Sequence, residues 1–199
     1  MPAPITEEQE RRDREALLAA AEALFYAQGV QAVGMDQIRT ASGLPLKRIY
    51  RLFATKEDLV VGVLRRRDQH WRARLSAYVD QVAEPRARLL AVFDWLAGWF
   101  AETGFRGCAW INVHGELGST SAPIAAEVRA HKQAFHDQIH AWARAAGLPD
   151  SEPVALLAEG AIVTAGITGD PAHARHARAA VEKFLTNPES PSAFRKAAR

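Results

Sequence analysis

Apolar residues recur at helical spacing along almost the whole chain, and no stretch alternates apolar with polar residues as a half-buried strand would. The clearest stripe, formed by Leu17, Ala21, Leu24 and Phe25, ends at Gly29, a residue typical of helix C-termini. With 199 residues, of which 48% are hydrophobic, the chain can build a core without a disulfide or a metal. The sequence therefore predicts a soluble all-α protein of about nine helices, in one large or two small domains.

Stop and cap signals divide the rest of the chain into further helices. Ser42-Gly43 separates two short helices, and Thr55 with Asp58 forms an imperfect capping box at the start of a long one. The segment after Asn187-Pro188 is polar and is expected to fray. The predicted helices after Gly29 are residues 35–41, 45–53, the long helix from Thr55 to Glu84-Pro85, then 86–103, 108–117, 123–146, 154–167 and 171–185.

The sequence also indicates that the protein resides in a reducing compartment and does not contact the membrane. Cys108 is the one cysteine, so no intrachain disulfide can form. Residues 1–15 lack the apolar core of a signal peptide. The longest apolar stretch, residues 89–101, is too short to span a bilayer and contains Asp94. We therefore expect a cytoplasmic protein that does not enter the membrane.

Charge is unevenly distributed, although the net charge of the chain is only +2. Residues 39–67 contain eight basic and two acidic side chains. Such a segment can face an anion such as DNA, or it can be a solvated helix face. Charge alone leaves both interpretations open.

The two short helices around Ser42-Gly43 predict a helix-turn-helix motif, within a three-helix unit. Gly43 supplies the backbone freedom of the tight turn. The second short helix is expected to enter the major groove, with Tyr50 and Lys56 placed to contact backbone phosphates. A small apolar core of Ile38, Leu44, Ile49 and Phe53 would fix the helix angle, and the side chains expected to point outward are Leu46, Lys47, Arg48, Arg51 and Leu52.

The stretch GVQAVGMDQIRTASGLPLKRIYRLFATKEDLV, residues 29–60, resembles the N-terminal domain of the TetR family of bacterial transcriptional regulators. Ten positions over about thirty residues carry the resemblance, namely Gly29, Ile38, Ala41, Gly43, Ile49, Tyr50, Phe53, Lys56, Glu57 and Leu59. It implies a DNA-binding domain over residues 1–55, followed by a helical regulatory and dimerisation domain over residues 56–187 and the polar tail 188–199.

The segment departs from the family pattern in three places, and the first of them removes two hydroxyl groups that would bind phosphate. Val33-Gly34 replaces the usual Thr-Ser, Pro45 replaces the Ser that begins the second helix, and Leu52 replaces a His. We interpret this as altered operator preference with DNA binding retained. The resulting DNA-binding set is Gly34, Pro45, Lys47, Arg48, Tyr50, Arg51 and Lys56.

The resemblance extends less specifically to residues 107–112 and 160–171, and it implies that the second domain binds a small apolar or aromatic molecule. Aromatic residues concentrate in the middle of the chain, where core packing is the simpler explanation for any one of them. Asn112, His114, Glu116 and His136 are the polar candidates there. The predicted ligand-binding residues are Trp95, Trp99, Trp110, Asn112, His114 and Phe135.

Residues 154–167 are apolar nearly all round, so this helix must be buried in a core or against a partner. The resemblance implies that the last two helices pair with those of a second subunit. A C2 homodimer would present two recognition helices to a pseudo-palindromic operator. The predicted interface residues are Leu156, Gly160, Val163, Gly166, Val181 and Phe184.

Other chemistry finds less support in the sequence. His136 and His140 have a spacing that can bind a metal, but no third ligand is evident, so no metal or other cofactor is predicted. A buried, inert role for Cys108 is favoured over a redox role. No catalytic motif occurs, and we expect no enzyme. The sequence therefore predicts a ligand-responsive repressor. The alternatives are an activator, a ligand-binding protein without DNA function and a metal-dependent enzyme.

Overall fold

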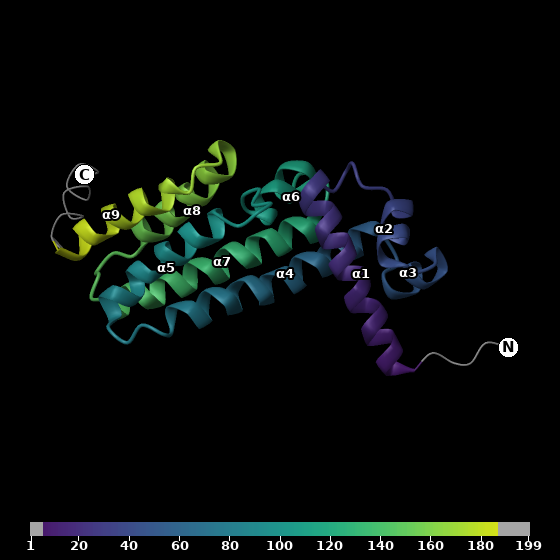
Figure 1. Cartoon of the computed structure of the whole chain (residues 1–199), viewed down its shortest axis with the longest axis horizontal. Coiled ribbons are helices and arrows are strands. Elements are labelled where there is room, and N and C mark those ends of the chain that lie inside the picture. The colour runs from purple at the N-terminus through teal and green to yellow at the C-terminus, as the bar shows by residue number, and fades with distance from the viewer. Residues whose placement is uncertain (1–5, 187–199) are drawn as a thin grey trace. The chain divides into compact units, whose positions relative to one another are not determined.

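In the computed structural model, residues 6–186 are described, and within them the chain forms nine helices and no strand. This confirms the predicted all-α fold. The predicted tail 188–199 and the first five residues lie outside the described part. The helices, shown in Figure 1, are α1 (Glu7–Gln28), α2 (Met35–Ser42), α3 (Leu46–Leu52), α4 (Lys56–Val79), α5 (Pro85–Phe100), α6 (Ala109–Leu117), α7 (Ala122–Ala145), α8 (Glu152–Thr168) and α9 (Ala172–Thr186).

Capping explains where the observed ends differ from the predicted ones. Thr55 and Asp58 form the predicted reciprocal cap of α4, because each accepts a hydrogen bond from the backbone N–H of the other at 3.0 Å. The prediction that α4 reaches Glu84 is wrong. Glu84 has an extended backbone and caps α5 instead, its carboxylate accepting from the N–H groups of Arg86 and Ala87. Helix α5 also ends at Phe100, three residues before the predicted end.

The chain divides into two compact units, and each interrupts the other in sequence. The first contains the residues up to His70 together with Ala109–Ala130, and the second contains Trp71–Cys108 and the residues from His131 on. The predicted functional boundary between residues 55 and 56 stays a prediction. None of the helices in residues 6–186 is both long and apolar enough to cross a membrane.

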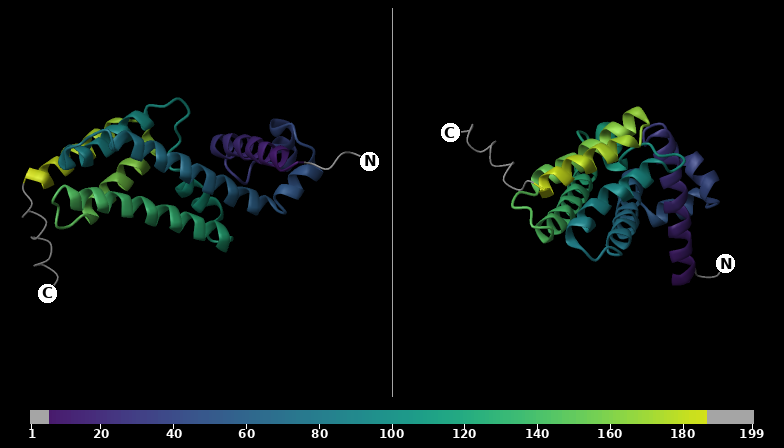
Figure 2. Two further views of the ribbon diagram at one scale, coloured as in Figure 1. Left: turned by 90° about the horizontal axis from the view of Figure 1, so that it is seen from below. Right: turned by 60° about the vertical axis from the view of Figure 1, so that its left-hand side comes forward.

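The first unit has a small, closed core beneath the helix-turn-helix. Apolar side chains from α1, α2, α3 and α4 meet there without exposure to solvent, and Leu17, Ile38, Ile49 and Leu59 are each 0% exposed. This core fixes which face of α3 points inward. In the second unit, α8 and α9 lie side by side and both pack on α5, as Figures 1 and 2 show.

Gly166 in α8 contacts the backbone of Gly107, so the two segments approach without side chains between them. A Cβ added at Gly166 would lie 2.8 Å from Cα of Gly107. We expect Gly166→Ala to destabilise the fold by about 1–3 kcal/mol, because backbone must move to make room. Gly98→Ala in α5 is the matched control, since its Cβ would have no neighbour within 4 Å and helix propensity favours alanine by about 0.5–1 kcal/mol. Urea unfolding of both variants measures the difference, and equal stability would contradict the close approach.

Candidate nucleic-acid interface

Two residues suited to a tight turn precede helix α3. Gly43 follows α2 in the left-handed conformation, with φ 70° and ψ 5°, and its N–H donates to the carbonyl of Arg39 at 3.1 Å. Pro45 caps α3 with an extended backbone and has no N–H to leave unpaired. The glycine-centred turn and the proline therefore fix the direction of α3, as the sequence predicted for Gly43.

The exposed face of α3 combines two cations with a phenol. Lys47, Tyr50 and Arg51 stand at i, i+3 and i+4, so they share one side of the helix. All three are exposed, Tyr50 to 47%. Neither Lys47 nor Arg51 forms a hydrogen bond or ion pair with any of residues 6–186. These charges therefore remain available to phosphates or guanine edges.

The prediction that Arg48 points outward is wrong, because its side chain is only 7% exposed. Its Nε donates to Oδ2 of Asp13 in α1 at 2.8 Å, and Nη1 lies 3.8 Å from Glu10. Leu52, also expected outside, is buried at 9% exposure. Helix α3 turns this face toward α1 because Ile49 must enter the core between them. Arg48 thus fixes α3 to α1 and is not presented to a partner.

The Arg48–Asp13 pair makes stability depend on pH in a defined direction. The hydrogen bond from Arg48 lowers the pKa of the Asp13 carboxyl below its ordinary value of about 3.9. Because the pKa of Asp13 is lower in the folded chain than in the unfolded chain, the pair contributes its full stability at pH values above the unfolded pKa. This contribution is lost as the pH falls through the folded pKa. Arg48→Met should therefore be less stable than the parent at pH 7, with the difference shrinking below about pH 4.

Urea unfolding at pH 7, 5 and 3.5 measures this effect. Arg39→Met is the matched control, because its ion pair with Asp36 lies at the surface, where the carboxylate is 83% exposed, and contributes little. A loss of stability in Arg48→Met that does not change with pH would contradict the assigned pair.

Lys56, predicted to contact phosphate, is used inside the unit. Its Nζ donates to the carbonyls of Val30 at 2.7 Å and Val33 at 2.6 Å, in the turn between α1 and α2. Burial lowers the pKa of Lys56, and the nearby carboxylate of Glu116 partly offsets this effect. Lys56 therefore has a structural role in holding this turn, and its contact with phosphate stays a prediction.

Glu116 of α6 binds the same turn from the other side. Its carboxylate accepts from the N–H of Val30 at 3.1 Å and of Gln31 at 2.8 Å, and its carbonyl accepts from the Gln31 side chain at 2.7 Å. Gly29 permits this approach, since a Cβ there would lie 3.1 Å from the carboxylate. The sequence places Glu116 among the polar ligand candidates, because the 85-residue separation from Gln31 hides this interaction.

Replacing Glu116 with glutamine should loosen the α1–α2 turn. An amide offers one acceptor oxygen for two N–H groups, so one hydrogen bond to a charged acceptor disappears, at a cost of about 1–3 kcal/mol. Hydrogen exchange at the amides of Val30 and Gln31 measures the change, and faster exchange is expected there. Glu182→Gln, at an exposed site on α9, is the control. Unchanged exchange at both amides would exclude the assigned hydrogen bonds.

Gly34 caps α2 without a side chain. Its N–H donates to Oε1 of Gln37 at 2.7 Å, which completes half of a capping box. Gly34 and Pro45 are both exposed, so their backbone is accessible near the turn, but neither brings a charge or a hydroxyl. Their part in DNA binding stays a prediction.

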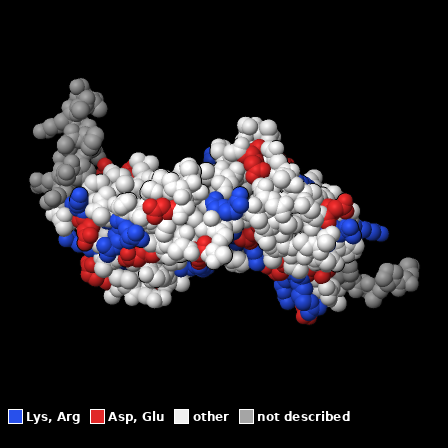
Figure 3. Space-filling view, turned by 45° about the horizontal axis from the view of Figure 1, so that its top comes forward, with Lys and Arg blue, Asp and Glu red and all other residues white. Residues whose placement is uncertain are grey.

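Most of the basic cluster in residues 39–67 is neutralised within the first unit. Arg66 pairs with Glu15 and Glu22, Arg67 pairs with Glu22, and Arg65 pairs with Glu127. Figure 3 shows the same pattern over its visible face, where Lys and Arg lie among Asp and Glu in small groups. Of the predicted anion-facing surface, only the exposed face of α3 therefore keeps uncompensated positive charge.

Two comparisons with known proteins agree with this architecture. The family model described as bacterial regulatory proteins, tetR family, matches residues 17–63. The crystal structure of a TetR-family transcriptional regulator from Streptomyces coelicolor, SCO4454, is similar with a TM-score of 0.81 and 27% sequence identity, covering 89% of this chain and 96% of that one. These matches support a TetR-family regulator. Its DNA-binding domain contains α2 and α3.

Other relatives of this TetR-family regulator support the same assignment. A putative TetR transcriptional regulator from Streptomyces avermitilis is 27% identical, with a TM-score of 0.74 over 90% of this chain and 97% of that one. An uncharacterized HTH-type transcriptional regulator of Mycobacterium tuberculosis, Rv1255c, is 28% identical over 120 residues, 55% of this chain and 56% of that protein. The chain thus spans about half the length of the curated relatives it matches.

The predicted ligand-binding residues of this TetR-family regulator fall in both units. In the second unit, Trp95, Trp99 and Phe135 surround Trp71, with ring centroids 5.1–5.3 Å from it in edge-to-face contacts. In the first unit, Trp110 is buried, whereas Asn112 and His114 are exposed on α6. The predicted ligand set is therefore not one cluster within either unit.

The centre of the aromatic cluster, Trp71, is a residue that the sequence does not single out. Its indole N–H and Oε1 of Gln138 are buried and have no hydrogen-bond partner in residues 6–186. An unpaired buried donor and acceptor call for a bound water or ligand. No sequence pattern distinguishes an unpaired indole from a packed one.

The predicted dimer residues divide into exposed and buried sets. Leu156 is 58% and Val163 38% exposed, and Ile167, which the sequence analysis did not select, is 80% exposed on the same helix. Val181 is 0% exposed, so it belongs to the core of the unit and the prediction of an interface role for it is wrong. Phe184 is half-buried and Gly160 is exposed. Gly166 is held against Gly107, so a charge placed there would disturb the fold before any dimer.

Proposed function

We propose that this TetR-family regulator binds a pseudo-palindromic operator as a homodimer, represses transcription, and is released by a small apolar or aromatic molecule. The observation that carries the proposal is the exposed, uncompensated set of Lys47, Tyr50 and Arg51 on one face of α3. The opposite face is anchored by Ile49 and by the Arg48–Asp13 pair. A rigid short helix with free cations and a phenol suits the major groove.

Dimerisation is supported by the exposed apolar stripe on α8. Leu156, Val163 and Ile167 lie at i, i+7 and i+11, which places them along one side of the helix. Large exposed apolar residues in a row mark a protein interface, because burying them removes apolar surface from water. A C2 dimer through this stripe supplies two recognition helices to the two half-sites.

Effector binding is assigned to the aromatic cluster around Trp71. The unpaired indole N–H would donate to a ligand acceptor, and Oε1 of Gln138 would accept from a ligand donor. Residues of α4 belong to both units, so the coupling is proposed to pass through this helix. A coupling free energy of about 1–3 kcal/mol would change operator affinity by about 5–150-fold. No catalytic step is proposed.

DNA binding is tested by titrating a fluorescent duplex of random sequence at increasing salt. The proposal predicts association whose affinity falls steeply with salt, since cations on α3 displace counterions from phosphate. The alternative of a ligand-binding protein without DNA function predicts no salt-dependent binding. Reporter expression in a strain lacking the gene then separates a repressor from an activator.

A further inference from the structure

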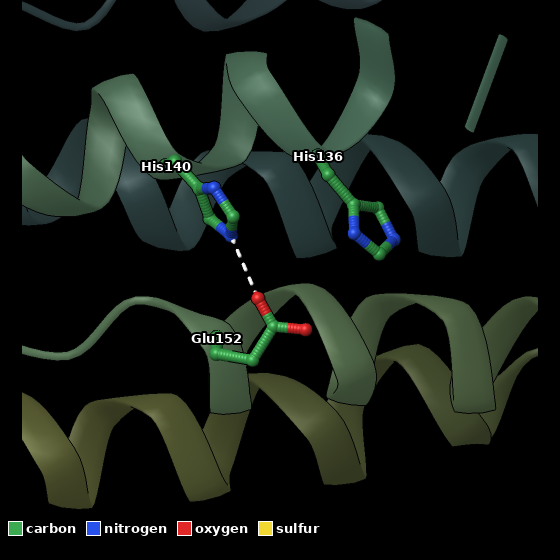
Figure 4. Close-up of side chains that lie close together, drawn as sticks. All are labelled: His136, His140 and Glu152. Atoms are coloured by element: carbon green, nitrogen blue, oxygen red, sulfur yellow. Dashed lines mark ion pairs between the residues drawn. The ribbon is translucent and has the colours of Figure 1, made fainter. Parts of the chain in front are cut away.

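Two histidines of α7 and one carboxylate of α8 converge in the second unit. Figure 4 shows His136 and His140 one turn apart on α7, on the side that faces Glu152 near the start of α8. One potential ligand atom from each of the three residues lies within 4.8 Å of the others, and no other such group occurs in residues 6–186. The sequence-based expectation that His136 and His140 lack a third ligand is therefore wrong, because chain folding after the α7–α8 turn brings Glu152 to them.

The distances fit the coordination sphere of a borderline divalent cation. Nε2 of His140 lies 3.2 Å from Oε2 of Glu152. Tetrahedral Zn²⁺ with bonds of about 2.0–2.1 Å places neighbouring ligand atoms about 3.3 Å apart. The pair already has this separation, and His136 needs a contraction that rotation of a side chain 24% exposed can supply.

A second carboxylate supports the site from behind His136. Oε1 of Glu159 lies 3.4 Å from Nε2 of His136, and Oε2 of Glu159 accepts from Nζ of Lys132 at 2.6 Å. Metal-bound histidines commonly have such an orienting carboxylate on the other ring nitrogen. Lys132, one turn before His136, is itself neutralised by Glu159 and so places no free cation beside the three ligands.

Two buried polar atoms of this group, Nε2 of His140 and Oε1 of Glu159, are in ion-pair contact with Glu152 and His136 but form no hydrogen bond within residues 6–186. Buried polar atoms are normally satisfied, and a cation bound between the His140 nitrogen and the Glu152 carboxylate would be coordinated by both. The ligands are reachable, because the side chains of His140 and Glu152 are 23% and 56% exposed.

We propose that His136, His140 and Glu152 bind one Zn²⁺-class divalent cation, with a water in the fourth position. Two imidazoles with one carboxylate select a borderline transition metal over Mg²⁺ or Ca²⁺, which require mainly oxygen ligands. The ion would join the end of α7 to the start of α8 and so restrain the connection between them. The proposal is independent of DNA binding and of the aromatic effector.

The test uses the full chain with any histidine tag removed, dialysed against chelator and then titrated with ZnCl₂ by calorimetry. The expected result is one Zn²⁺ per chain, together with a rise in the thermal midpoint that MgCl₂ does not produce. His140→Ala and Glu152→Gln should each weaken binding at least about tenfold and abolish the thermal shift. Glu152→Gln keeps the side-chain shape at an exposed position, so it tests the ligand role even where His140→Ala impairs folding.

A double replacement of His173 and His176 by alanine is the matched control. These neighbouring histidines of α9, with ring centroids 6.1 Å apart, belong to no three-ligand group in the described chain. The control should bind Zn²⁺ as the parent does. Loss of binding in the control, retained binding in Glu152→Gln, or no saturable binding by the folded parent would each overturn the proposal.

Discussion

Replacing Lys47 and Arg51 together with alanine should weaken operator binding by at least about 100-fold, while folding and dimerisation remain intact. Removing a side chain that binds a base edge or a phosphate is expected to cost about 1–3 kcal/mol. Both side chains are exposed and unpaired with residues 6–186, so their removal leaves no buried group unsatisfied. The slope of log affinity against log salt should also decrease by about one for each phosphate that the variant no longer neutralises.

Fluorescence anisotropy with an operator duplex at several salt concentrations measures this effect. Arg175→Ala, which removes an exposed arginine from α9 in the second unit, is the control and should bind as the parent does. Arg48→Met distinguishes the structural role of Arg48 from the DNA-binding role of Arg51, since its main expected effect is a lower stability of the fold. Equal operator binding by the Lys47/Arg51 variant and the parent would refute the assigned reading face.

A glutamate at Leu156 together with one at Val163 should convert the dimer to a monomer. Each subunit would bring two unpaired carboxylates into an apolar interface, and a buried unpaired charge costs several kcal/mol. The dimer should therefore dissociate at micromolar concentration, with a loss of affinity of at least about 1000-fold. Operator binding should fall as well, because each monomer reads only one half-site.

Sedimentation velocity over a concentration series measures the association. Tyr78→Glu is the matched control, because Tyr78 is a large apolar residue, 43% exposed, outside the α8 stripe. It should sediment as the parent does. A dimer that survives both glutamates on α8, with the helical content unchanged, would place the interface elsewhere.

The order and number of helices could be predicted because periodicity, glycine stops and capping residues are local signals. The direction of α3 was also predictable from Gly43 and Pro45. Which arginine of α3 faces inward was not, because that depends on Asp13, which lies 35 residues earlier in α1. The same limit explains Lys56, since the carbonyls that it binds lie in a turn 23 and 26 residues before it.

The candidate sites show the same division between local and distant signals. The i, i+4 spacing of His136 and His140 was visible, whereas their third partner depends on how α7 and α8 meet. Likewise Val181 fits an apolar helix face, but whether that face meets α5 or a second subunit is decided by packing. Glu116 was recognised as polar and central, and only the folded chain brings it to the backbone of Val30 and Gln31.

The central claim, a symmetric dimer that reads DNA through α3, is tested most directly by selecting bound duplexes from a random-sequence pool. The selection is performed at physiological salt with the parent and with the Lys47/Arg51 alanine variant, followed by sequencing. We predict that the parent enriches an inverted repeat whose half-sites are about one helical turn or more apart, and that the variant does not. Enrichment of the same repeat by the variant, or no enriched sequence from a folded, dimeric parent, would contradict the claim.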